Sequence, residues 1–155
     1  MGRVAAPLAG LAPEQPFADA ARRIIGVRAQ EVFAQVDGVL DVRDPECLHN
    51  MRVATRRLRA AFEVFAVCFP RGELRAVTSD VKTLARALGA RRDCDVQIEL
   101  LVALRATVPA SERKAIDKLL DGLSREQLKA NRRLAKSLAR AERNDLSGRL
   151  QQLSR

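Results

Sequence analysis

A basic cluster with helical spacing is the feature of this sequence best suited to chemistry. Four side chains lie three and four residues apart: His49, Arg52, Arg56 and Arg59. At about 100° per residue they share one face of an α-helix, along which they rise about 15 Å. The row meets no acidic residue until Glu63, and arginine grips phosphate oxygens in pairs. The spacing therefore predicts a site for a linear chain of anions rather than for a single small anion.

Two further helical segments repeat this basic pattern. The first ridge follows residue 70 and consists of Arg75, Ser79, Lys82 and Arg86. The second ridge lies near the C-terminus and consists of Arg125, Lys129, Arg132, Arg133, Lys136 and Arg140. Ridges that face a common groove would focus the electrostatic field there. The alternative is the solvated outside of an amphipathic helix. We favour that alternative for the second ridge, whose cations alternate with acids, and the binding interpretation for the row at His49.

The excess positive charge is concentrated in the middle of the chain. The 155 residues carry 28 Lys and Arg against 19 Asp and Glu, a formal net charge of +9, and residues 49–92 alone carry 10 basic and 3 acidic side chains. A polyanion is therefore the expected partner. Aromatic residues make up only 3% of the chain, which argues against a protein that stacks single-stranded bases. Unspecific binding of duplex nucleic acid through Arg and Lys remains the alternative.

The elements that position these residues are predicted to be helices almost throughout, because good helix formers dominate and strand alternation is rare. A first helix is expected over Phe17–Asp37, with Gly38 as its stop. The second helix begins after Asp44, an N-cap followed by Pro45 in the first turn. We expect Pro70 to end it.

The second half of the chain is expected to hold two long helical segments and two shorter ones. A core-facing stripe follows residue 70 with spacings of three and four: Leu74, Val77, Val81, Leu84 and Leu88. Gly89 is predicted as a C-terminal cap, and a shorter helix over Asp93–Arg105 is apolar nearly all round, so we expect it to be the most buried. A long helix resumes after Pro109, and Asn144 and Asp145 break it before a short final helix. Short connections predict an antiparallel up-and-down bundle of about four main helices.

Length and composition bound the organisation of the protein. We expect one helical domain over residues 17–155 after a flexible tail over residues 1–16, which Pro and Gly interrupt. No run approaches 18 apolar residues, so no membrane span is expected. The three cysteines are far apart and form no Cys-x-x-Cys pair, which indicates a reducing cytoplasm rather than a disulfide framework or a zinc site.

Two motifs in order resemble a known family. Residues 48–59 read LHNMRVATRRLR, which is similar to the His-x-x-Arg-Val-x-x-Arg-Arg-Leu-Arg helix of the CHAD family, the conserved histidine α-helical domain. Residues 88–96 read LGARRDCDV and resemble that family's Leu-Gly-x-x-Arg-Asp-x-Asp-Val. Such proteins are helical, bind inorganic polyphosphate along a basic surface, and often accompany triphosphatase domains or polyphosphate granules. The resemblance implies no cofactor and a polyphosphate-binding set of His49, Arg52, Arg56, Arg57, Arg59, Lys82, Arg86, Arg91 and Arg92.

The resemblance also has a consequence for assembly. A typical CHAD domain is similar to two copies of a helical unit, and this chain resembles only the first copy, over about residues 17–153. Either the chain is a fragment or two chains pair to rebuild the missing half. We expect a homodimer, because symmetric pairing of identical units is the commonest closed assembly. A location in the cytoplasm, beside polyphosphate granules, follows from the same resemblance.

His49 has more than one interpretation. Neighbouring cations disfavour its charged form and a bound polyanion favours it, so polyphosphate should bind more tightly near pH 6 than near pH 8. The alternative is a neutral histidine that fixes helix packing. A metal site is the least favoured reading, because the chain has no second histidine.

The acidic residues near these motifs are expected to be structural. Asp93 and Asp95 are interpreted as an N-cap and as partners of the adjacent arginines, and Glu63 as a partner of Arg59 or of a facing arginine. The sequence has no phosphate-cradling Gly-rich loop, no Ser/His/Asp set and no Glu-x-Glu-x-Lys. We therefore expect a binding module and not an enzyme. A divalent-metal phosphohydrolase is the third alternative, which would need carboxylates to hold Mg²⁺.

Overall fold

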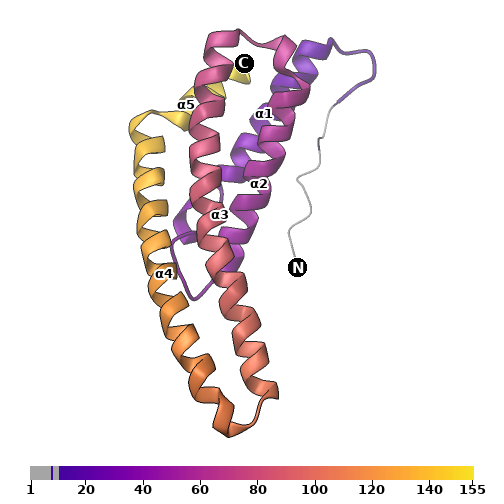
Figure 1. Cartoon of the computed structure of the whole chain (residues 1–155). Coiled ribbons are helices and arrows are strands. Elements are labelled where there is room, and N and C mark those ends of the chain that lie inside the picture. The colour runs from indigo at the N-terminus through magenta and orange to yellow at the C-terminus, as the bar shows by residue number, and fades with distance from the viewer. Residues whose placement is uncertain (1–7, 9–10) are drawn as a thin grey trace.

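The computed structural model describes residue 8 and residues 11–155, and these form an antiparallel bundle of helices without strands (Figure 1). Its elements are α1 (Phe17–Phe33), η1 (Val36–Gly38), α2 (Pro45–Val64), η2 (Ala66–Cys68), α3 (Arg71–Thr107), α4 (Ala110–Arg143) and α5 (Leu146–Leu153). α2 packs against both α1 and α3, α4 packs along α3, and α5 closes one end of the bundle against α1, α3 and α4. The predicted all-α fold is confirmed. The tail expected over residues 1–16 falls largely on residues 1–7 and 9–10, which lie outside the described residues.

One hydrophobic core holds the bundle together where α1, α2, α3 and α5 meet. The predicted stripe of α3 is confirmed, since Val77, Val81, Leu84 and Leu88 are each at most 2% exposed and Leu74 packs at the edge of the core. The opposite helices contribute further side chains with at most 1% exposure: Ile25 of α1, Met51 and Leu58 of α2, and Leu146 and Leu150 of α5. Burial of this apolar surface is what fixes the orientation of the basic faces on the other side of α2 and α3.

The start of α2 is confirmed and its end is not. Asp44 accepts a hydrogen bond from the backbone N–H of Glu46 at 3.0 Å, with Pro45 in the first turn. The helix ends at Val64 instead of at Pro70, and the short turn η2 follows. At this point Phe65 leaves the helix and packs against Phe17 of α1, with ring centroids 5.3 Å apart. The C-terminal cap of the helix is therefore the residue that makes this aromatic contact, five residues before the proline.

The first helix is also shorter than expected. α1 ends at Phe33, and η1 follows in place of the predicted continuation to Asp37. This turn directs Val39 into the core, where it is fully buried. Gly38 lies in η1, and a Cβ added there would lie 2.6 Å from Cys47 Sγ. Its role is therefore to allow a close approach of the chain to α2.

The prediction that Gly89 caps a helix and Asp93 begins another is wrong. α3 is one continuous helix, and both residues lie in its interior. A glycine inside a helix costs only about 1 kcal/mol relative to alanine, and the flanking residues Leu88 and Arg91 are fully buried. Packing on both sides outweighs that cost, so the helix continues.

The prediction that the segment Asp93–Arg105 is the most buried is also wrong. α3 has 37 residues and α2 has 20, lengths of about 55 and 30 Å. The part of the α3–α4 hairpin formed by residues 96–129, called here the outer hairpin, therefore extends beyond α1 and α2 (Figure 1). Six of its large apolar side chains are 37–64% exposed: Val96, Leu100, Val102, Leu104, Leu119 and Leu128.

Candidate functional site

A groove of about 760 Å³ lies between the C-terminal half of α2 and the N-terminal half of α3. Its floor is apolar and includes Phe62, Phe69 and Leu74, of which the two phenylalanines belong to the buried core. Its walls carry four cations from the two helices: Arg59, Arg71, Arg75 and Lys82. The groove therefore brings the basic face of α2 and the basic face of α3 together.

The remaining predicted cations continue along the same seam between α2 and α3. The two helices run antiparallel, so a step of one turn from Arg59 to Arg56 on α2 corresponds to a step from Lys82 to Arg86 on α3. Arg52 lies one further turn along α2, within about 60° of Arg56 and Arg59 around the helix axis. Arg52, Arg56, Lys82 and Arg86 are all exposed to solvent. The two helices thus form a basic strip that is wider and longer than the groove itself.

The cations of this strip have no acidic partners. Among the described residues, five of these cations and the imidazole of His49, one turn before Arg52 on α2, have no carboxylate oxygen within 4 Å; the six side chains are His49, Arg52, Arg56, Arg59, Lys82 and Arg86. The Nε of Arg59 is buried and also lacks a hydrogen-bond partner. We call these six residues the unpaired row.

The acids close to the unpaired row do not neutralise it. Glu63 lines the groove, but the predicted ion pair with Arg59 is wrong, since no such pair forms in the part of the chain that is described. Asp80 of α3 pairs instead with Arg149 of α5 and accepts a further hydrogen bond from Asn144 at 3.4 Å. The strip therefore keeps its positive charge.

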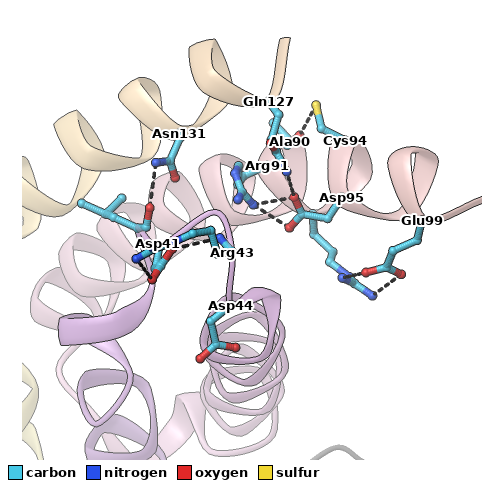
Figure 2. Close-up of polar contacts among 12 residues, drawn as sticks. Asp41, Arg43, Asp44, Ala90, Arg91, Cys94, Asp95, Glu99, Gln127 and Asn131 are labelled. Carbon is cyan, nitrogen blue, oxygen red and sulfur yellow. Dashed lines mark hydrogen bonds and ion pairs between the residues drawn. The ribbon is translucent and has the colours of Figure 1, made fainter. Parts of the chain in front are cut away.

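Three of the predicted binding residues lie elsewhere. Arg57 is about 140° from Arg52 around α2, on the side of that helix away from the groove. Arg91 is fully buried, and its Nη1 donates to both carboxylate oxygens of Asp95 at 2.6 and 2.5 Å (Figure 2). Arg92 is partly buried and pairs with Glu99 at 3.0 Å. Arg91 and Arg92 are thus occupied by carboxylates of their own helix.

The structural role predicted for Asp95 is confirmed. Asp95 is 4% exposed, binds Arg91 and accepts a hydrogen bond from Gln127 Nε2 of α4 at 2.7 Å (Figure 2). Close by, Asn131 of α4 donates to the carbonyl oxygen of Leu40 at 2.9 Å. This polar network fixes α4 to α3 and to the η1–α2 connection at the level where the outer hairpin leaves the bundle.

Arg71 is a groove residue that the sequence reasoning missed. It lies in the first turn of α3, directly after Pro70. The partial positive charge of a helix N-terminus disfavours a cation there, so an arginine in the short turn just before the predicted stripe at Leu74 was the available signal. Arg75 was recognised as part of a ridge but not as a binding residue.

Two further features of the described residues are the grouping of potential metal ligands and the apolar character of the helices. No group of three His, Cys, Asp or Glu side chains lies close enough to hold a metal ion there. In the same part of the chain, no helix has both the length and the apolar character that crossing a bilayer requires.

The fold and the groove define an all-helical bundle with a basic seam between two antiparallel helices. The family model of the CHAD domain matches residues 23–155, and the chain belongs to that family. This match confirms the resemblance seen in the two motifs. No curated protein and no solved structure matches the chain significantly.

Proposed function

We propose that the protein binds inorganic polyphosphate along the seam between α2 and α3 and performs no chemistry on it. The observation that carries the proposal is the unpaired row, six cationic or protonatable side chains without a carboxylate partner. Cations on an ordinary solvated helix face pair frequently with acids three or four residues away, as Lys129 and Glu126 do on α4. A row without such pairs fits a ligand whose own charges repeat along its length.

The proposal includes a second copy of the chain as a partner. The outer hairpin exposes six large apolar residues and carries six basic and five acidic side chains, so it is nearly neutral in a protein of net charge +9. Two copies can approach through this surface without bringing their basic seams together. Light scattering should give the mass of a dimer for the wild type and of a monomer for Leu100→Glu. A wild-type monomer at tens of micromolar would contradict the pairing.

Nucleic-acid binding is the competing function, because the same seam could contact a duplex backbone. A competition experiment separates the two: labelled duplex DNA is bound first and unlabelled long-chain polyphosphate is added. We expect displacement at a far lower phosphate concentration than unlabelled DNA requires. The reverse order would support the nucleic-acid function.

Phosphohydrolase activity is the third candidate. It would require Mg²⁺ held by carboxylates, and Glu63 is the acid that lines the groove. We expect no phosphate release from polyphosphate with Mg²⁺ present. Release that disappears in Glu63→Gln would overturn the non-catalytic proposal.

The direct test is a titration of labelled polyphosphate of defined length. Arg56→Ala and Lys82→Ala remove one cation from each side of the seam, and each should weaken binding about 3- to 10-fold, which corresponds to roughly 1 kcal/mol. Lys118→Ala is the matched control, an exposed lysine on the outer hairpin. Equal losses in Lys82→Ala and Lys118→Ala would mean that binding follows net charge alone. In cells, the proposal predicts cytoplasmic protein beside polyphosphate granules.

A further inference from the structure

We propose that α4 carries a second polyanion-binding surface on the opposite edge of the molecule, and that the protein bridges two polyphosphate segments. This inference rests on the proposed function of the α2–α3 seam. The second surface consists of five exposed cations, called here the α4 ridge: Arg132, Arg133, Lys136, Arg140 and Arg143. They fall within about 100° around the helix axis and rise about 16 Å along it.

The α4 ridge points away from the rest of the bundle. On the inner side of the same helix, Gln127 contacts Asp95 of α3, Asn131 contacts the chain at Leu40, and Leu134 is fully buried. The centre of the ridge lies about 180° around the helix axis from the middle of these three positions. α4 packs against α3 and α5, whereas the basic seam lies where α3 meets α2 (Figure 1). The two cationic surfaces therefore occupy separate edges of the bundle.

The α4 ridge is not neutralised. Residues 127–141 contain five basic side chains and no acidic one, and within the described residues no ridge side chain forms an ion pair. Below the ridge, Glu126 binds Lys129 at 2.7 Å. This hydrogen bond, and then the charges of Lys129, Arg133 and Arg125, lower the pKa of Glu126. Glu126 therefore interacts with the cations near the N-terminal end of the ridge and not with those further along it.

The one acid within the span of the ridge, between Arg140 and Arg143, also faces elsewhere. Glu142 lines an apolar pocket with Leu138 and Leu146, between α4, α5 and the end of α1. The expectation that acids alternate with the cations of this helix therefore holds at Glu126 and fails over the next four turns. An exposed, uncompensated row of this length has the same character as the unpaired row of α2 and α3.

Two such surfaces on a rigid bundle have a consequence that one surface lacks. A short polyphosphate can occupy either surface, so one chain of the protein should take up two short ligands. Long polyphosphate should be linked into networks, because each molecule holds two segments at a fixed separation. An excess of polyphosphate should dissolve the networks again by occupying each surface with a separate ligand.

The test is the number of short polyphosphate chains bound per protein chain, measured by calorimetry. A count per protein chain is unaffected by pairing of the protein itself. The ridge variant Arg132→Gln, Lys136→Gln and Arg140→Gln removes three exposed cations while keeping good helix formers. We expect two ligands for the wild type and one for this variant, with the tighter affinity changed less than about twofold. The charge-conserving variant Arg132→Lys with Arg140→Lys should keep two bound ligands.

The seam variant Arg52→Gln, Arg56→Gln and Lys82→Gln separates failure of this inference from failure of the proposed function. We expect it to retain one ligand, bound at the α4 ridge. If the wild type binds one ligand and the seam variant binds none, the second surface is overturned and the proposed function stands. Two ligands in the ridge variant would also overturn the second surface. If the seam variant binds as many ligands as the wild type, and with the same affinities, the proposed function is overturned.

Discussion

Removing the carboxylate of Asp95 should destabilise the protein strongly. Arg91 is fully buried and Asp95 is 4% exposed, and they meet at 2.5–2.6 Å with Gln127 as the second donor to Asp95. Two other N–H groups of Arg91 are buried without a partner among the described atoms. The variant Asp95→Ala therefore leaves a guanidinium charge in the interior with nothing to compensate it.

The size of the effect follows from the burial of the pair. Breaking a buried ion pair by removing one partner costs about 3–5 kcal/mol. For a chain of this size each kcal/mol lowers Tm by roughly 2–4 °C, so we expect Tm to fall by about 6–20 °C. Replacing both partners, as in Arg91→Met with Asp95→Leu, removes the uncompensated charge and should restore most of the loss.

Thermal and urea unfolding followed by circular dichroism measure this difference. The matched control is Glu99→Ala, which breaks the ion pair of Arg92 with a carboxylate side chain that is 53% exposed. An exposed pair contributes about 1 kcal/mol or less. If Asp95→Ala and Glu99→Ala destabilise the protein equally, or if the double replacement restores nothing, the argument from burial is refuted.

Three further predictions concern single positions. Gly89→Ala should raise the free energy of unfolding by about 0.5–1 kcal/mol, because the added Cβ meets open space beside α3. Gly38→Ala should lower the free energy of unfolding, because its Cβ would lie 2.6 Å from the sulfur of Cys47. Urea titrations measure both changes. A hydrogen bond from Arg105 lowers the pKa of Asp117 below its ordinary value of 3.8. This pair therefore stabilises the fold above pH 4, and the stabilisation is lost as the pH falls through the lowered pKa. The Tm of Arg105→Ala should accordingly change less than that of the wild type between pH 4 and more acidic pH.

Local chemistry was predictable from the sequence where neighbouring residues decide the structure. Asp44 and Pro45 begin α2 as expected, because a cap and a proline act within one helical turn. The core stripe that ends at Leu88 was also predictable, since periodicity alone determines which face can be buried. The basic row of α2 follows from the same periodicity.

Features that depend on other parts of the chain were not predictable. Whether α3 continues through Gly89 depends on packing that outweighs a small local cost. Whether the apolar residues after Asp93 are buried depends on how far a second helix reaches along α3, and α2 reaches no further than its own first residue, Pro45. Likewise Arg91 and Arg92 look alike in sequence, and only their position against Asp95 and Glu99 removes them from the accessible surface.

The salt dependence of polyphosphate affinity tests the central claim most directly. The logarithm of the association constant is measured against the logarithm of salt concentration for the wild type and for Arg52→Ala with Arg56→Ala. Each arginine that contacts phosphate should contribute about one unit of slope, so we expect the double variant to lose about two units while Lys118→Ala keeps the wild-type slope. A double variant with an unchanged slope and affinity would show that the seam between α2 and α3 does not hold the polyanion.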